Sequence, residues 1–370
     1  MQSPLLPWEV IKRIMSQCGD HPATLYNFSL TCHQLRFRSL CFMVADPEFQ
    51  SRGQIFDFCD FLRAKSHLKP FVRSIACFPD HFAPFPLLRI LPNLPALVFP
   101  PPKSTIVCGY VPTVLNRSTL ICCRQLSTHI QILRLNQLSF PTSSEFARVL
   151  LAFTRVIRLC TDVVIRAQGS QAHRDVIKQR LSERLRLRAL TIGFNPSLHS
   201  FERKNSVLWS DEEDEGSVAA LLLGLGLAQS TVESLTLGVH RSNRFAPPFG
   251  NWSRLRSLVL ELCFNLADIT NTIALLTDFH CPTLEVVMVK VYAGRIIQEL
   301  SGRTGPELCR EFEGALLRFP EPQMMWIVKG TPRRFNSFWT GELRKRFPAL
   351  FRINALTVTF RTANRICRSQ

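Results

Sequence analysis

The side chains best suited to chemistry in this sequence are its 13 cysteines and nine histidines. Thiolates and imidazoles are common nucleophiles, general bases and metal ligands in proteins. The cysteines form no Cys-x-x-Cys pair, and the adjacent Cys122 and Cys123 have poor geometry for an ordinary disulfide or for two ligands of one zinc ion. His280 stands beside Cys281 but has no companion at ligand spacing. We therefore expect no metal site, no cofactor and no catalytic residue.

Other catalytic motifs are missing from the sequence as well. It contains no phosphate-binding G-x-x-x-x-G-K-[ST] loop and no G-x-S-x-G motif. Gly224 and Gly226 fall inside a predicted helix, so they do not form a dinucleotide-binding turn. Glu311 and Glu313 are expected on opposite sides of a helix, in contact with solvent. A cysteine nucleophile remains an alternative, because catalytic triads are recognised only in space.

The chain is strongly basic, with 45 Lys and Arg residues against 28 Asp and Glu residues and a formal net charge of +17. A basic surface permits contact with nucleic acid or with an acidic partner. The basic residues are scattered, with short clusters at 184–188 and 344–346. Long Arg stems commonly cover apolar surface while their charged ends stay in water. We therefore do not expect nucleic-acid binding, and phosphate contact is kept as an alternative.

One acidic run, 211–215, lies in a segment that we interpret as a loop. A solvated loop is the simplest account, because acidic residues also favour the N-terminus of the helix predicted after it. The alternatives are a docking site for a basic partner and a phosphorylation site at Ser210.

Cysteine usage and hydropathy indicate the cellular compartment. Most cysteines lie in apolar contexts, as at Cys59, Cys77 and Cys160, which is typical of reduced, buried thiols. The N-terminus lacks the basic-then-apolar pattern of a signal sequence, and the longest apolar run, 218–228, is too short to span a bilayer. We expect a cytoplasmic or nuclear protein that makes no membrane contact.

A short phrase of three apolar anchors, apolar-x-x-apolar-x-apolar, recurs along the chain and predicts strands, because alternate residues of a strand point to one side. Its well-formed copies are Val72/Ile75/Cys77, Leu94/Leu97/Phe99, Ile130/Leu133/Leu135, Leu187/Leu190/Ile192, Val232/Leu235/Leu237, Leu255/Leu258/Leu260, Leu284/Val287/Val289 and Ile353/Leu356/Val358. Weaker copies begin at Thr154, with Ile157 and Leu159, and at Met324, with Ile327 and Lys329. Successive copies begin roughly 29 residues apart at the median.

Helical patterns separate these phrases, over 54–67, 144–153, 174–187, 217–228, 268–279, 307–319 and 337–347. Strands that alternate with helices are typical of an α/β fold with a parallel sheet, and such units must stack to cover their apolar faces. The Pro-rich segment 100–125 shows little periodicity, and we interpret it as a long loop. We expect an irregular solenoid over 48–360, with a parallel inner sheet and outer helices, and a polar tail over 361–370.

The first 47 residues predict two or three short helices. Val10, Ile11 and Ile14 lie on one face of a helix that Pro7 can begin, because a proline in the first turn loses no hydrogen bond. Gly19 suits the end of this helix, and Pro22 suits the start of the next. So small a group can hardly bury a core of its own, so it must pack on the rest of the chain or on a partner.

This segment resembles an F-box, the adaptor-binding motif of cullin–RING ubiquitin ligases, and in particular the F-box-like proteins of basidiomycete fungi. The matching residues are Leu6-Pro7, Glu9, Val10, Ile11, Ile14, Met15, Leu25 and the run Ser29-Leu30-Thr31-Cys32. Cys18 and Leu35 stand where the family more often has Leu and Trp. The recurring phrase resembles the strand of leucine-rich repeats, although the Asn or Cys that follows it there is present only at Asn195 and Cys263.

The resemblance implies a non-catalytic substrate receptor. The F-box-like motif over 1–47 would bind a Skp-family adaptor, and through it a cullin–RING ligase. The implied adaptor contacts are Leu6, Pro7, Ile11, Ile14, Leu25 and Leu30. The repeat domain would hold a protein substrate on the side chains between the apolar anchors, among them Arg134, Asn136, Arg158, Thr191, Thr236, Glu261, Met288 and Lys290.

An alternative is a repeat scaffold whose N-terminal helices only cap the solenoid, with its scattered basic residues contacting nucleic acid. Exposure of the first helix distinguishes the two hypotheses. Capping would bury the face that contains Leu6, Ile11 and Ile14, whereas adaptor binding would leave part of it open.

Overall fold

The computed structural model describes residues 7–19, 21–78, 85–100, 111–112, 117–167, 171–193, 231–239, 252–263, 266–293, 305–329 and 336–361. Leu6, Ser210, the acidic run 211–215, the helix predicted over 217–228 and all but the first residue of the predicted tail lie outside these ranges.

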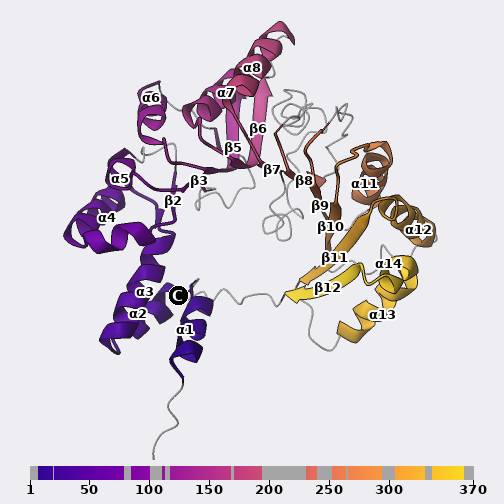
Figure 1. The fold of residues 1–370 in the computed structure, drawn as a ribbon, viewed down its shortest axis with the longest axis horizontal. Coiled ribbons are helices and arrows are strands. Elements are labelled where there is room, and N and C mark those ends of the chain that lie inside the picture. The colour runs from indigo at the N-terminus through magenta and orange to yellow at the C-terminus, as the bar shows by residue number, and fades with distance from the viewer. Residues whose placement is uncertain are drawn as a thin grey trace, which may run out of the picture. The chain divides into compact units, whose positions relative to one another are not determined.

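The chain is mixed α/β, and parallel strands form its framework (Figure 1). Eleven strands of the described chain follow one another in the sheet in sequence order. They are β1 (Glu48–Phe49), β2 (Ser74–Cys77), β3 (Ala96–Phe99), β5 (Ile132–Thr142), β6 (Arg158–Ala167), β7 (Ala189–Ile192), β8 (Ser234–Val239), β9 (Ser257–Cys263), β10 (Val286–Ala293), β11 (Glu321–Lys329) and β12 (Leu356–Arg361). A short strand outside this order, β4 (Val111–Pro112), pairs with β5.

Helices precede β1 and occupy most of the described connections between strands. They are α1 (Trp8–Gln17), α2 (Pro22–Ser29), α3 (His33–Ala45), α4 (Arg52–Ala64), the 3₁₀ helix η1 (Ser66–Phe71), α5 (Phe85–Ile90), α6 (Arg117–Leu126), α7 (Ser143–Ala152), α8 (Gln171–Arg184), α11 (Leu266–Asp278), α12 (Gly305–Leu316), α13 (Asn336–Arg346) and α14 (Pro348–Arg352). The helices predicted within these residues are therefore present, each with small differences at its ends.

The chain divides into two compact units. Unit 1 comprises Met1–Lys103, Thr113–Asn136 and Arg148–Val156, and unit 2 comprises Ser104–Pro112, Gln137–Ala147 and Ile157–Gln370. The domain boundary expected after residue 47 falls inside unit 1 and stays a prediction.

Unit 1 begins with the three helices that precede β1. The carbonyl of Pro7 accepts hydrogen bonds from the backbone N–H groups of Val10 and Ile11, at 3.0 and 3.2 Å, and so begins α1. Met15 of α1 and Leu25 of α2 are buried in this unit, and α2 packs along α3.

The start of α4 is fixed by reciprocal hydrogen bonds between side chains and backbone. Ser51 Oγ accepts from the N–H of Gln54 at 3.3 Å, and Gln54 Oε1 accepts from the N–H of Gln50 at 2.7 Å. The first contact satisfies a donor that the first turn of a helix leaves unpaired, and the second holds the residue before the N-cap against this turn.

Unit 2 has a core built from two rows of apolar side chains that cross its strands. The second anchors of successive phrases, Leu190, Leu235, Leu258 and Val287, are register neighbours. The third anchors, Ile192, Leu237, Leu260 and Val289, form the adjacent row, and both rows are buried. Among the helices of this unit, α11 packs against β8 and β9, and α14 packs against β11.

Both weaker copies of the phrase were placed in the wrong register by the sequence. In β6, Leu159 and Thr161 pair with the anchors Leu190 and Ile192, so the phrase begins at the buried Val156 rather than at Thr154. In β11, Met324 and Trp326 are both buried and pair with the anchors Leu356 and Val358 of β12, so Met324 is the second anchor rather than the first. Thr161 and Trp326 differ from the aliphatic anchors that the pattern specifies, and this difference concealed the register.

Two further expectations were wrong. The end of the segment interpreted as a long loop forms α6, in which Cys123 is buried. Glu313, expected in solvent, is only 6 % exposed, and its Oε1 accepts the backbone N–H of Leu350 at 2.8 Å. Leu350 lies in the first turn of α14, where N–H groups have no partner within the helix. Glu313 therefore caps α14 from α12.

Candidate functional site

The first candidate site is formed by exposed apolar residues of α1 and α2. Val10 and Ile14, one helical turn apart on α1, are 40 % and 41 % exposed. Tyr26 and Leu30, one turn apart on α2 and at its C-cap, are 56 % and 70 % exposed. Large apolar side chains exposed in pairs in this way are typical of a surface that meets a partner.

The residues that the F-box resemblance implied as adaptor contacts have different exposures. Pro7 and Leu30 are exposed, Ile14 is 41 % exposed, and Ile11 is half-buried. Leu25 is only 1 % exposed, so it packs in the core of unit 1 and presents no surface to a partner. Leu6 lies outside the described residues.

The second candidate site is the face of the unit 2 sheet opposite the buried rows; we call it the sheet face. Its central row is Cys160, Thr191, Thr236, Val259, Met288 and Gln323, each paired in register with the next. All six are half-buried, and none is charged. Thr191, Thr236 and Met288, three of the expected substrate contacts, are therefore brought into one row by the fold.

Charged residues flank this central row. Arg158 of β6 is exposed in the preceding row, where it pairs with Ala189. In the following row, Lys290 Nζ lies 2.9 Å from Glu261 Oε1 across the register pair of β9 and β10. With side-chain exposures of 28 % and 13 %, this pair is partly shielded from solvent, so these two charges neutralise each other.

The two remaining expected contacts lie in unit 1. Arg134 of β5 is exposed and pairs in register with Val98, and Asn136 is half-buried. The structure therefore groups six of the eight expected substrate contacts on the sheet face.

The third candidate site, which we call the charged edge, was not anticipated from the sequence. It lies at the amino ends of β7–β10, where Arg188, Glu233, Arg256 and Glu285 each directly follow the first anchor of a phrase. Backbone hydrogen bonds fix the order of this row, because the carbonyls of Arg188, Glu233 and Arg256 each accept two N–H groups from the next strand segment, at 2.8–3.1 Å. The charges alternate along the row, a signal that was readable in the sequence as Arg, Glu, Arg, Glu at one phrase position.

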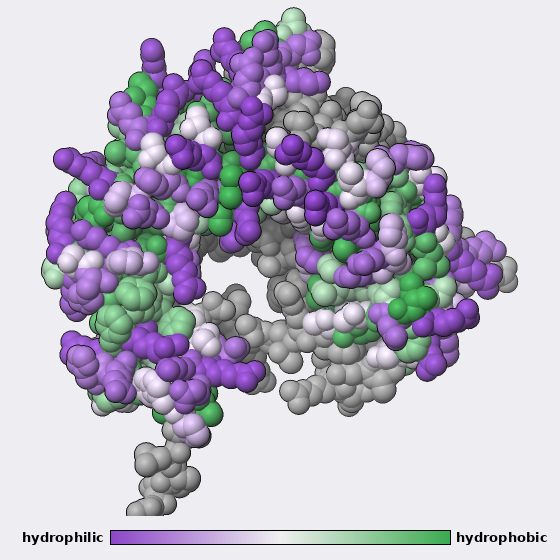
Figure 2. Space-filling view, viewed as in Figure 1, coloured by the Kyte–Doolittle hydropathy of each residue, from purple (hydrophilic) through white to green (hydrophobic). Residues whose placement is uncertain are grey.

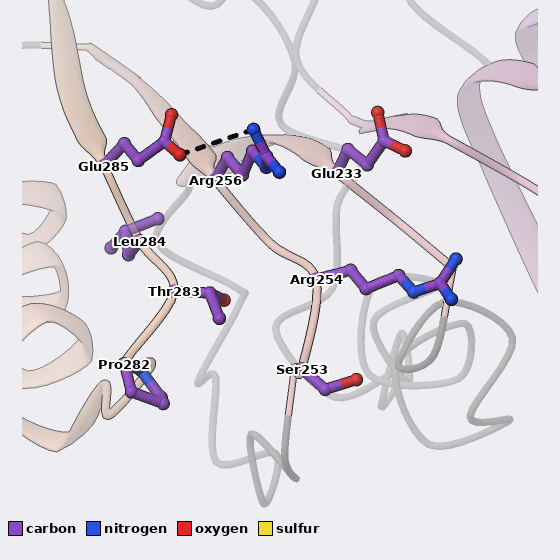
Figure 3. A pocket seen from close by; sticks show the side chains of 8 residues that line it. All are labelled: Glu233, Ser253, Arg254, Arg256, Pro282, Thr283, Leu284 and Glu285. Carbon is purple, nitrogen blue, oxygen red and sulfur yellow. Dashed lines mark ion pairs between the residues drawn. The ribbon is translucent and has the colours of Figure 1, made fainter.

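An open depression of about 530 Å³ lies along the charged edge (Figure 3). It is lined by Glu233, Ser253, Arg254, Arg256, Pro282, Thr283, Leu284 and Glu285. Arg256 Nη1 lies 3.5 Å from Glu285 Oε1, with both side chains more than half exposed, so this ion pair is strongly screened by water.

Most of the side chains that line the depression are polar or charged. Its eight lining residues include no His and no Cys. Thr283 Oγ1 donates a hydrogen bond to the carbonyl of Leu255 at 2.9 Å, so that hydroxyl is already engaged in structure. The arrangement can form ion pairs with a peptide.

Three of the buried thiols in the described ranges have raised pKa values. Burial raises the pKa of Cys77 far above its usual value, and burial followed by the neighbouring Cys122 raises the pKa of Cys123 to about 12. Burial also raises the pKa of Cys309, partly offset by Arg346. Each of these three thiols is protonated at neutral pH, and a protonated thiol is a poor nucleophile and metal ligand.

The described ranges contain neither a candidate metal cluster nor a candidate membrane span. They contain no group of three or more His, Cys, Asp or Glu side chains placed to hold a metal ion. None of their helices combines the length and the apolar character needed to cross a membrane.

Comparison with protein-family models gives no match to this chain, and comparison with curated proteins gives none.

Proposed function

We propose that this chain is a non-catalytic, F-box-like substrate receptor, whose N-terminal helices bind a Skp-family adaptor and whose sheet face holds a protein substrate for a cullin–RING ubiquitin ligase. The proposal rests on the resemblance of the N-terminal segment to an F-box and on the exposure of its apolar residues. It includes a cytoplasmic or nuclear location.

The observation that carries the proposal is the exposure of Ile14 and Leu30, at 41 % and 70 %. Helices that only capped the strands behind them would turn such residues inward, because burial of apolar surface stabilises by about 25 cal/mol per Å². Their exposure to water is unfavourable in an isolated chain. A partner that docks on them buries this apolar surface and so gains binding free energy.

We further propose that unit 2 is an irregular leucine-rich-repeat-like solenoid. This finer description is supported by the agreement of the recurring phrase with successive parallel strands. The sheet face suits a protein substrate because its central row is uncharged and the adjacent Glu261 and Lys290 are paired with each other. A substrate that docks there meets few charges that must lose water.

The adaptor interaction is tested by the double substitution Ile14→Ser and Leu30→Ser in the full chain. Both side chains are exposed, so we expect the fold to persist while co-purification with a Skp-family adaptor is lost. Anchors of protein interfaces typically contribute about 2 kcal/mol or more each, roughly a 30-fold change in affinity. The companion variant Leu6→Ala with Pro7→Ala should have the same effect.

The matched control is Ile121→Ser on α6, because Ile121 is 45 % exposed, much like Ile14, but lies outside the F-box-like segment. This variant should bind the adaptor as the unmodified chain does. Undiminished co-purification of the Ile14/Leu30 variant would refute the adaptor assignment and favour helices that merely cap the fold.

A further inference from the structure

The last strand of unit 2 is incompletely covered. In the four well-formed phrases of unit 2 that precede it, from Leu187 to Val289, every anchor is at most 4 % exposed. In the final phrase Ile353 is 53 % exposed, and Leu356 and Val358 are half-buried. Figure 2 shows apolar residues at the surface around α14 and β12. Within the described residues, β12 pairs with β11 alone and stands at the end of the strand order.

The backbone of β12 presents a regular set of groups at this open edge. The carbonyl of Ala355 accepts the N–H of Met324 on β11 at 2.7 Å. In a parallel pair, the N–H and C=O of one residue point to the same neighbour, and those of the next residue point to the opposite side. The backbone groups of residues 355, 357 and 359 are therefore directed to β11, and those of Leu356, Val358 and Phe360 are directed to the open edge.

The sequence of β12 is symmetric in pattern. It reads Leu356-Thr357-Val358-Thr359-Phe360, so Val358 has Thr on both sides and a large apolar residue beyond each Thr. If two copies of this strand pair antiparallel about Val358, Leu356 stands opposite Phe360 and Thr357 stands opposite Thr359. Apolar residues then meet apolar residues on one face, and threonines meet threonines on the other.

The backbone and the side chains require the same register. Antiparallel pairing about Val358 makes Val358 a hydrogen-bonded pair with its symmetry copy, which requires its N–H and C=O to be directed outward, as the β11–β12 bonds imply. The strand also lacks the inward charges, prolines and bulges that commonly protect an open edge, and its one charged residue, Arg361, lies at its end.

We propose that the open edge of β12 is a homodimer interface, in which two copies of this chain pair β12 antiparallel about Val358 and continue the sheet of unit 2 across a twofold axis. A twofold interface uses the same patch on both subunits, so a self-complementary strand is the form it requires. The pairing also covers Leu356 and Val358. The proposal is independent of adaptor binding.

The test uses charge at the two threonines that this register places opposite each other. Thr357 is exposed and Thr359 half-buried on the side away from the core, so charged residues there are compatible with the fold. One variant of the full chain combines Thr357→Lys with Thr359→Lys, and a second combines Thr357→Glu with Thr359→Glu. Residue 357 of one copy faces residue 359 of the other in a non-hydrogen-bonded pair, where side chains are closest and like charges repel.

Sedimentation equilibrium over a concentration series is the measurement. We expect twice the chain mass for the unmodified protein, the mass of one chain for each variant alone, and twice the chain mass again for their equimolar mixture. The control combines Thr154→Lys with Thr277→Lys, two exposed threonines outside β12, and should remain a dimer.

Each other result overturns the proposal. An unmodified chain with single-chain mass throughout means that β12 is not a self-interface. Like-charged variants that stay dimeric place the interface elsewhere. Variants that separate but do not associate when mixed contradict the register about Val358. Circular dichroism of every variant confirms that the compared chains are equally folded.

Discussion

Glu313 shows how a charged side chain can stabilise this fold without serving a site. It is buried on α12, and its carboxylate accepts the N–H of Leu350 at the start of α14. The sequence suggested a solvated residue because a glutamate in an amphipathic helix is usually exposed. Its partner lies 37 positions away in the chain, and a contact at that separation leaves no local signature.

Replacement of this residue should destabilise the protein. Glu313→Ala leaves the N–H of Leu350 buried without its acceptor, at an expected loss of about 1–3 kcal/mol in the free energy of unfolding. Urea denaturation followed by circular dichroism measures the change. Glu311→Ala, two residues away and exposed, is the control and should stay within about 0.5 kcal/mol of the unmodified chain. Equal effects of the two substitutions would show that the cap contributes nothing.

At the scale of secondary structure, the α/β class and the parallel sheet were predictable from the sequence. The apolar phrase has a period of two within a strand, and each of its well-formed copies overlaps a strand of the structure. This worked because strands buried on one side must repeat apolar residues at alternate positions. The pattern located the strands even where intervening residues vary widely in number.

The same pattern gave the wrong register where an anchor position holds a residue that is not aliphatic. Thr161 occupies an anchor position of β6, and Trp326, which pairs with Val358, occupies one of β11. The register in which a strand pairs with its neighbour decides which of its residues join the core. The apolar pattern of one strand alone does not specify that register. The α6 helix was missed because its apolar residues follow a Pro-rich stretch that obscures a short helical period.

Thr161 also provides a test of the buried row of third anchors, in which it pairs with Ile192. Its side chain is 3 % exposed, pairs with Ile192, and has a hydroxyl without a hydrogen-bond partner in the described chain. Thr161→Val keeps the shape of the side chain and removes the unsatisfied hydroxyl. We therefore expect the free energy of unfolding to rise by about 1–2 kcal/mol, as measured by thermal denaturation. Thr191→Val, on the half-buried sheet face, should change it by less than about 0.5 kcal/mol. Destabilisation by Thr161→Val would mean that the hydroxyl is satisfied.

A candidate site could be predicted where it depends on residues close together in the sequence, and not where it depends on packing between distant segments. The sheet-face residues follow from strand alternation, so their common side was foreseen in unit 2. The burial of Leu25 was not foreseen, because its spacing fits a helical face but the packing partner decides whether that face is covered. The charged edge was missed because ligand and nucleophile motifs have short spacings along the chain, whereas the residues of this row come from four successive strand segments.

For the molecule as a whole, the buried thiols predict a loss of stability in alkali. The pKa of Cys123 is raised from 9.0 to about 12, first by burial and then by Cys122. The folded state therefore holds a proton that the unfolded state releases near pH 9. The stability from this thiol is complete below pH 9 and is lost as the pH rises toward 12, at up to about 1.4 kcal/mol per pH unit. The pKa of Cys77 is raised in the same direction.

Urea midpoints measured from pH 8 to 11 test this expectation. Cys123→Ser removes the titrating group, so stability should fall less steeply with pH in that variant than in the unmodified chain. Cys32→Ser, at an exposed thiol, is the control and should retain the original slope. Identical slopes for all three proteins would exclude a contribution from the buried thiol.

The charged edge has a consequence for how the chain can change in length. Arg188, Glu233, Arg256 and Glu285 alternate in sign along neighbouring strands. Deletion of either middle strand with its connection, or tandem duplication of any one of the four, would bring two like charges together at this edge, whereas a change by two adjacent strands would keep the alternation. Like charges opposite each other in a sheet are destabilising. Gene rearrangements that alter this part of the protein should therefore be tolerated best when they add or remove segments in pairs.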